Sequence, residues 1–177
     1  MKQKGLRYDG SIDKYPIAEG EIYCLGNGSK ITIADITNGL PDFSKKADCV
    51  FIDPAGNKGV LKAYYTKAEK ACPVQSFDEF VTYIKSCIEQ IKPERIFVEC
   101  FARNKNQILP MVESLFPNVK VYNNTYYHSK KNECWIIQGS KQPEDWGLDG
   151  MDEWDAVFKI CKEVPFNAIT DFFLGQG

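Results

Sequence analysis

The segment from Phe51 to Asn57, FIDPAGN, contains the side chain with the clearest potential for chemistry, the carboxylate of Asp53. Asp53 follows a short apolar run and precedes Pro54, whose ring fixes the backbone. A carboxylate held in this way can accept hydrogen bonds from an exocyclic amine and orient its lone pair. We therefore expect Asp53 and the backbone carbonyl of Pro54 to position a planar amine for attack on an electrophile. Asp-Pro is also common in ordinary turns, so the pair alone does not decide the function.

The segment from Asp171 to Gly177, DFFLGQG, is the second motif of interest. Glycines directly after a strand let the backbone approach a ligand closely, and the amides of a following helix would face that ligand. A lone Gly-x-Gly pattern is weak evidence, because glycines in a terminal tail more often belong to a frayed end. The order of the two motifs along the chain gives the second one its weight.

Asp53-Pro54 resembles a degraded Asp-Pro-Pro-aromatic motif, and residues 171–177 resemble the Asp-Pro-Phe-x-Gly-Ser-Gly cofactor motif of S-adenosylmethionine-dependent amino-methyltransferases. In the permuted DNA adenine-N6 methyltransferases, the catalytic motif precedes the cofactor motif, as it does here. The resemblance extends from Ile31 to Gly177. It implies an α/β fold with a Rossmann-like class I methyltransferase sheet, which is permuted and mostly parallel with an antiparallel edge hairpin.

The resemblance implies roles for individual residues. It puts Asp53 and Pro54 at the target amine. It puts four residues around the methionine part of S-adenosylmethionine, namely Asp171, Phe173, Gly175 and Gly177. Asp35, at the end of a strand expected over residues 29–35, matches an acid near the cofactor adenine, although an N-cap or turn aspartate is an equal interpretation. The candidates for substrate binding are Asn57, Lys58, Tyr64 and Tyr65.

The chain departs from the family pattern in two places. Ala55 and Gly56 replace the second proline and the aromatic residue. That aromatic ring stacks on a base flipped out of the duplex, a contact worth about 1–3 kcal/mol. Either Tyr64 or Tyr65 supplies a ring instead or the site is weakened, and both tyrosines could equally be packing residues. A full cofactor site also needs a helix and a strand after Gly177, so we expect a further tail rather than a second polypeptide or a remnant without catalysis.

The residues around these motifs predict strands that alternate with helices. Short apolar runs predict two buried strands, Cys49–Ile52 and Arg95–Cys100. Ser76 with Glu79 predicts the start of a helix that ends at Ile91. A second helical stripe extends over residues 108–116, in which Pro110 fits only within the first turn.

The second half of the chain changes its pattern. Residues 119–127 and 133–138 predict two strands of an antiparallel hairpin, joined by the polar residues 128–132. Residues 142–150 predict a polar loop, and a third helix is predicted to begin near Asp152. The order strand, helix, strand, helix and hairpin favours an α/β sheet with one antiparallel edge.

Length and composition favour one domain. At 177 residues with 44% hydrophobic content, the chain can bury a single core. We expect a methyltransferase-like domain over residues 29–177 and an N-terminal extension over residues 1–28. No apolar run has the length of a membrane helix or the character of a secretory signal, so we expect a cytoplasmic protein.

Cysteine, histidine and charge content limit the chemistry further. The seven cysteines are odd in number and far apart, which favours buried, reduced thiols. With one histidine, His128, and no paired-cysteine spacing, we expect no metal site. A net charge of −2 indicates that any surface for nucleic acid is local. Its candidates, each of which could equally be an ordinary solvated residue, are Lys58, Lys62, Lys67, Lys70, Arg103, Lys105, Lys130 and Lys131.

We expect an enzyme that transfers a methyl group from S-adenosylmethionine to adenine N6 in double-stranded DNA, in a phage or restriction–modification setting. An amino-methyltransferase that acts on cytosine N4, RNA or protein is the nearest alternative, because any planar amine shares this chemistry. A non-catalytic module that binds nucleic acid or protein is a second alternative. An α/β domain of another kind is the third.

Overall fold

The computed structural model describes residues 18–24, 28–67, 69–126, 129–163 and 169–173, of which 126, 129–133 and 169–173 are described by their backbone alone. The chain divides into two compact units, residues 1–39 and 40–177. The division expected after residue 28 stays a prediction.

The first unit contains an antiparallel pair of two-residue strands, β1 (Tyr23–Cys24) and β2 (Lys30–Ile31), and the 3-10 helix η1 (Ile36–Asn38). The strand predicted over residues 29–35 is therefore wrong beyond Ile31, apart from one isolated bridge at Ile33. Ile31 and Ile33 are 43% and 49% exposed. The two side chains would lie on the same face of the expected strand, and that face is not buried. Burial therefore does not favour a longer strand here.

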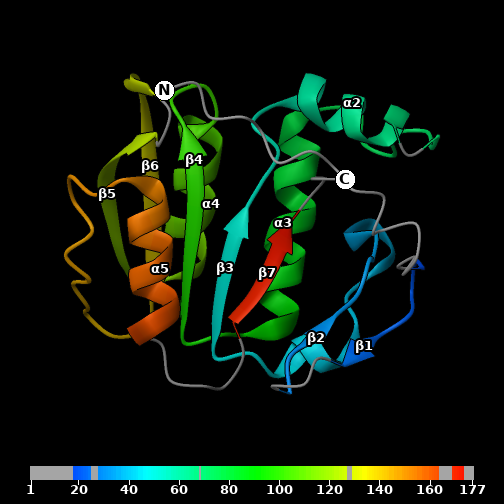
Figure 1. The fold of residues 1–177 in the computed structure, drawn as a ribbon, viewed down its shortest axis with the longest axis horizontal. Coiled ribbons are helices and arrows are strands. Elements are labelled where there is room, and N and C mark those ends of the chain that lie inside the picture. Colours follow the sequence, from blue (N-terminus) through cyan, green and yellow to red (C-terminus); the bar gives the residue numbers. More distant parts are fainter. Residues whose placement is uncertain (1–17, 25–27, 68, 127–128, 164–168, 174–177) are drawn as a thin grey trace, which may run out of the picture. The chain divides into compact units, whose positions relative to one another are not determined.

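A five-stranded mixed sheet forms the core of the second unit (Figure 1). In spatial order its strands are β5 (Asn118–Tyr126), β6 (Ser129–Ser140), β4 (Arg95–Phe101), β3 (Cys49–Asp53) and β7 (Ile169–Phe173). β3 is parallel to β4 and to β7, whereas β6 is antiparallel to β4 and to β5. The predicted α/β class, the two buried strands and the antiparallel pairing of the hairpin are confirmed. The prediction that residues 128–132 join the hairpin strands is wrong for 129–132, because β6 already begins at Ser129.

Helices cover both faces of this sheet. They are the 3-10 helix η2 (Asp42–Lys46) and the α-helices α2 (Lys58–Lys67), α3 (Phe77–Ile91), α4 (Lys105–Leu115) and α5 (Glu153–Glu163). Figure 1 shows α3 and α4 on one face, α5 on the other, and α2 beyond the end of β3. On the α5 face, Phe51, Phe97 and Tyr122 pack in one cluster with Ala156 and Ile160 of that helix. Of the helices that the structure describes, none combines the length and apolar character needed to cross a bilayer.

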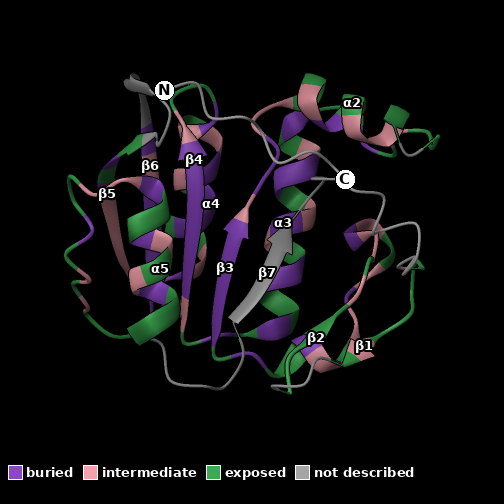
Figure 2. Cartoon of the chain, viewed as in Figure 1, coloured by how far each residue is buried: buried purple, intermediate pink, exposed green. Residues whose placement is uncertain are grey.

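The helix α3 forms where its sequence signals predict it. The Ser76 hydroxyl accepts a hydrogen bond from the Glu79 amide at 3.1 Å, which satisfies an N-terminal donor. Its apolar stripe is buried, as Figure 2 shows by colour: Phe77, Phe80, Val81, Ile84, Cys87, Ile88 and Ile91. The helix ends at Lys92, whose left-handed backbone has φ of 55°. This predicted helix is confirmed with both of its ends.

The helix α4 begins earlier than its apolar stripe predicts. Pro110 is the sixth residue of the helix, so the expectation that it lies in the first turn is wrong. The proline removes a hydrogen bond to the carbonyl of Asn106, but both residues are exposed and water can solvate that carbonyl. Burial of Ile108 and Val112 against the sheet favours the helix in spite of this loss.

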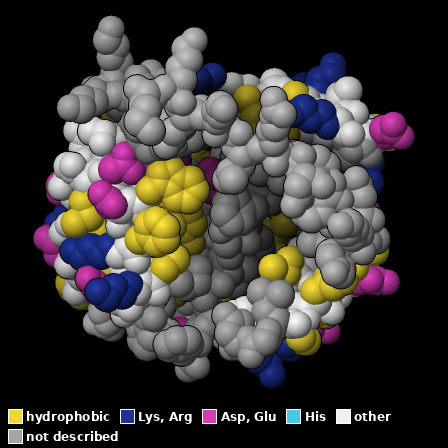
Figure 3. Space-filling view, in the orientation of Figure 1, with side chains coloured by type: hydrophobic (Ala, Val, Ile, Leu, Met, Phe, Trp, Pro, Cys, Tyr) yellow, Lys and Arg dark blue, Asp and Glu magenta, His cyan; other side chains and the backbone are white. Residues whose placement is uncertain are grey.

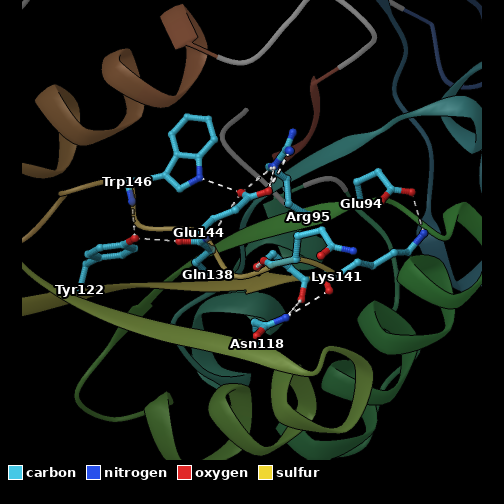
Figure 4. Close-up of polar contacts among 10 residues, drawn as sticks. Glu94, Arg95, Asn118, Tyr122, Gln138, Lys141, Glu144 and Trp146 are labelled. Atoms are coloured by element: carbon cyan, nitrogen blue, oxygen red, sulfur yellow. Dashed lines mark hydrogen bonds and ion pairs between the residues drawn. The ribbon is translucent and has the colours of Figure 1, made fainter.

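A polar network ties the β5–β6 pair to the loop that precedes α5 (Figure 4). The Tyr122 hydroxyl donates to Gln138 Oε1 at 2.7 Å and accepts from the Trp146 amide at 2.7 Å. Glu144 accepts from the Trp146 indole at 2.9 Å and from Arg95 of β4 at 2.9 and 3.0 Å. The network satisfies Gln138, which is 1% exposed. It therefore fixes the polar loop predicted over residues 142–150 to the amino end of β4.

Four of the seven cysteines, Cys49, Cys87, Cys100 and Cys134, are buried, and all seven are free thiols. Burial raises the pKa of Cys49 and of Cys100 to about 12. Cys24 and Cys161 are exposed, so the expectation of buried thiols is wrong for these two. Cys24 lies in the short strand β1, and Cys161 lies on the outer side of α5.

We expect Tyr122→Phe to lower the free energy of unfolding by about 1–3 kcal/mol, because it leaves Gln138 Oε1 and the Trp146 amide without their partner. Urea denaturation measures the change. The matched control is Tyr83→Phe, which removes a hydroxyl from a half-buried tyrosine of α3. Equal losses in the two variants would contradict a structural role for the Tyr122 hydroxyl.

Candidate functional site

The carboxyl edge of the sheet brings the two sequence motifs together. β3 is parallel to both of its neighbours, so the carboxyl ends of β4, β3 and β7 lie at one edge (Figure 1), where such sheets bind ligands. Asp53 is the last residue of β3 and pairs with Phe173, the last residue of β7. Asp171 pairs with Phe51, while Gly175 and Gly177 lie outside the described residues. The two motifs thus contain the last residues of adjacent strands, and these last residues are paired.

The Asp53 side chain lies on the α5 face of the sheet, because it is two residues from Phe51 along β3. It is half-buried, and the two residues that follow, Pro54 and Ala55, are buried. Loss of hydration raises the pKa of the Asp53 carboxyl above its ordinary value. A carboxylate with a raised pKa is a stronger proton acceptor, which suits it to bind the N–H of an amine.

Asp53 belongs to a group of acidic side chains at this edge. The β3–β4 register pairs Ile52 with Val98, so one further step sets Asp53 opposite Glu99. Glu99 is 8% exposed, and its Oε1 accepts a hydrogen bond from the Cys134 thiol at 3.7 Å. Glu153, 6% exposed at the start of α5, also hydrogen-bonds Glu99.

The site holds fewer charges than it has carboxyl groups. Burial, together with the negative charges of Asp53 and Glu153, raises the pKa of Glu99 to about 8. Glu99 therefore keeps its proton at neutral pH, and the Cys134 thiol, whose pKa burial and the nearby carboxylates also raise, stays protonated. This distribution leaves Asp53, the most solvent-accessible of the three carboxyls, free to carry negative charge.

Glu99, Cys134 and Glu153 are also of the kind that could hold a metal ion, because their ligand atoms lie within 4.8 Å of one another. Thiol and carboxyl groups bind a metal in their ionised forms, so metal binding here would release protons. The expectation of a protein without a metal site stays a prediction.

Glu99, Cys134 and Glu153 were not among the site residues predicted from the sequence. One signal was present: Glu99 is an acid inside the apolar run RIFVEC, and a charge in a buried strand is rare unless it is paired or neutral. Glu153 has no comparable signal, because acids are common in the first turn of a helix.

The candidate substrate-binding residues Asn57 and Lys58 make local structural contacts. Asn57 Oδ1 accepts from the Val60 amide at 3.0 Å, which caps α2. Lys58 donates through its Nζ to the backbone carbonyl of Gln75. Both residues directly follow the Asp53 loop, and their roles in substrate binding stay predictions.

Tyr64 and Tyr65 are half-buried residues of α2. They are the seventh and eighth residues of this helix, so they lie about 9–10 Å along its axis from Lys58. Figure 1 shows α2 extending outward from the end of β3. The helix axis therefore leads away from β3, and the roles of Tyr64 and Tyr65 in substrate binding stay predictions.

Asp35 belongs to the first unit and caps η1. Its Oδ1 accepts hydrogen bonds from the Thr37 amide at 3.0 Å and from the Thr37 hydroxyl at 2.7 Å. The N-cap interpretation of Asp35 is thus confirmed. Its expected role near a cofactor adenine stays a prediction.

The candidate basic surface is exposed in the parts that the structure describes. The lysines Lys58, Lys62, Lys67 and Lys70 are exposed on and after α2, and Figure 3 shows basic side chains in this region. Arg103 is exposed in the turn after β4, and Lys105 Nζ lies 4.4 Å from the centroid of the Trp135 ring. The side chains of Lys130 and Lys131 lie outside the described residues. Because α2 and the Arg103 turn follow β3 and β4, positive charge lies at the same edge as Asp53.

No family model matches the chain, and a search of curated protein sequences also finds no match. The functional interpretation therefore depends on the two motifs, on their register in the sheet and on the acidic group around Asp53.

We expect the free energy of unfolding to fall as the pH rises from about 4.5 to about 8, because folded Glu99 retains a proton that the unfolded chain loses near its ordinary pKa of 4.5. Glu99→Gln cannot titrate, so its stability relative to the wild type should increase across this range. Urea denaturation at a series of pH values measures the difference. The control is Glu89→Gln at an exposed position of α3. Identical dependence of stability on pH for the wild type and Glu99→Gln would refute the raised pKa of Glu99.

Proposed function

We propose that this chain carries the catalytic part of an S-adenosylmethionine-dependent methyltransferase that acts on adenine N6 in DNA. One observation carries the proposal: Asp53 and Phe173 are paired last residues of adjacent parallel strands. The two motifs that resemble the catalytic and cofactor motifs of amino-methyltransferases are far apart in sequence, yet they leave the sheet side by side. Transfer of a group from a bound cofactor to a bound amine requires the two binding sites to be adjacent. Two motifs that begin at neighbouring strand ends would meet this requirement.

The strand order also supports this proposal. The resemblance implies a permuted, Rossmann-like class I sheet that is mostly parallel and ends in a reversed strand pair. The parallel strands β7, β3 and β4 followed by the antiparallel β6 agree with that arrangement. The antiparallel β5–β6 pair lies on the far side of β4 from the proposed cofactor edge.

The position of β7 beside β3 supports S-adenosylmethionine as the cofactor. The cofactor would need a glycine-containing turn directly after the strand that neighbours the catalytic strand, and β7 is that neighbour. Asp171, Phe173, Gly175 and Gly177 would hold its methionine part. When bound, S-adenosylmethionine would supply an electrophilic methyl group.

Asp53 would bind and orient the target amine. Its carboxylate would accept a hydrogen bond from the N6–H of adenine, with the backbone carbonyl of Pro54 as a second acceptor. Two acceptors in fixed positions turn the nitrogen lone pair out of the ring plane and toward the methyl group. When the N–C bond forms, the nitrogen must lose a proton, and the raised pKa of Asp53 makes its carboxylate a better acceptor for it.

The neutral state of Glu99 would assist this step. If Glu99 were ionised beside Asp53, the two negative charges would repel one another and favour protonation of Asp53. A protonated Asp53 would be a weaker hydrogen-bond acceptor and could not take up the proton that the amine loses. Burial of Glu99 under α5 thus removes one negative charge from beside Asp53.

We expect Asp53→Ala to lower the rate of methyl transfer by about 100-fold or more, because the amine loses its main orienting contact. Mass spectrometry of nucleosides, after incubation of the full-length protein with S-adenosylmethionine and DNA, measures N6-methyladenine. The control is Asp48→Ala, which removes an exposed carboxylate just before the amino end of β3.

Calorimetry with S-adenosylmethionine and its demethylated product tests the proposal independently of activity. Absence of binding by the full-length wild-type protein would overturn it. Methylated cytosine, RNA or protein in place of N6-methyladenine would retain the chemistry and correct the substrate. Cofactor binding by both wild type and Asp53→Ala, together with transfer by the wild type alone, is the expected pattern.

A further inference from the structure

Gly56 occupies the position where the resembled motif has an aromatic ring, and its surroundings are open. A Cβ atom at this position would lie 3.8 Å from Cδ2 of Phe101, which is ordinary van der Waals contact. Gly56 is also not among the glycines with positive φ. The backbone there accepts larger side chains, and the neighbour that they would meet is an aromatic ring.

Phe101 is the last residue of β4, at the carboxyl edge that holds Asp53. It lies two residues after Glu99 along the strand, so its ring is on the same face as the Glu99 and Asp53 side chains. Phe101 is half-buried. Because a Cβ at Gly56 would lie 3.8 Å from this ring, the ring lies beside the loop that follows Asp53.

The backbone of Phe101 is held firmly. Its N–H donates to Asn104 Oδ1 at 2.7 Å, and its carbonyl accepts from the Asn104 amide at 3.0 Å. Asn104 is 1% exposed, and Phe101 also pairs with Cys134 across to β6. A ring on a fixed backbone loses little conformational entropy when a ligand packs against it.

We infer that Phe101 provides the aromatic surface on which the target base stacks, in place of the ring that is missing at Gly56. This inference rests on the proposed function, since it names the residue that holds the base whose amine Asp53 binds. The chain thus supplies from the neighbouring strand a contact that the resembled motif supplies from the catalytic loop. The exposed Arg103, two residues further on, adds positive charge for the adjoining phosphate.

The experiment uses the full-length protein and a short oligodeoxyadenylate in which 2-aminopurine replaces one adenine. Stacking of 2-aminopurine on an aromatic ring quenches its fluorescence. We expect the wild type to quench it, and Phe101→Ala to weaken oligonucleotide binding about 5- to 150-fold, which is a stacking contact of about 1–3 kcal/mol expressed as affinity. Phe101→Leu keeps more of the packing volume and should lose the quenching even if Phe101→Ala folds poorly.

Two further variants sharpen the test. Gly56→Tyr combined with Phe101→Leu should restore quenching and affinity, because a Cβ at position 56 meets no close contact and the new ring would take the place of the aromatic in the resembled motif. Phe43→Leu, at a half-buried phenylalanine of η2 outside this edge, should leave both unchanged. Quenching by Phe101→Leu equal to that of the wild type, or no quenching by the wild type, would overturn the inference.

Methyl transfer by the same variants separates this inference from the proposed function. If the wild type and Phe101→Leu transfer methyl groups with the same KM and kcat, the proposed function stands and the role of Phe101 fails. If the wild type transfers no methyl group but quenches 2-aminopurine through Phe101, the proposed function fails and the stacking surface stands. Loss of both signals in Phe101→Leu, with recovery in the double variant, is the result that we expect.

Discussion

Parallel pairing of β3 with β7 is the interaction on which the candidate site depends. β7 comes from the end of the chain, and only this pairing brings it next to the strand that carries Asp53. Because the two strands are parallel, their carboxyl ends coincide, and the register sets Phe173 opposite Asp53. An antiparallel β7, or a register shifted by several residues, would separate the motifs even if every other contact remained. Backbone hydrogen bonds between β3 and β7 therefore decide whether the two motifs lie close together.

A second constraint is the small number of charges that the α5 face can bury. Asp53, Glu99 and Glu153 lie close enough to influence one another's ionisation, and Glu99 and Glu153 are almost fully buried. Ionising all three in this low-dielectric region would be costly, so at least Glu99 remains protonated near neutral pH. The packing of α5 against the sheet thus influences the ionisation of Asp53, although Asp53 belongs to β3 and not to α5.

Local signals predict much of the fold and little of the site. Ser76 and the apolar stripe that follows define α3 because both act within one segment, and the apolar run before Asp53 defines β3 for the same reason. The group of Glu99, Cys134 and Glu153 assembles from β4, β6 and α5, and no pattern within one segment reports on it. Pro110 is the opposite case, in which a local signal leads to a wrong prediction. Proline disfavours the interior of a helix, but burial of neighbouring residues outweighs this preference.

The departures at Ala55 and Gly56 agree with the structure around them. Ala55 is 5% exposed, so the core has room for a small side chain at that position. Asn57 follows at once and caps α2, and at Gly59 a Cβ would lie only 3.0 Å from Asn57 Oδ1. The loop after Asp53 is thus short and leads directly into a helix, whereas the ring of Phe101 belongs to a strand. A ring carried by a strand of the sheet is held more rigidly than one carried by a loop, so in the proposed function a base contact on β4 can replace one in the loop after Asp53.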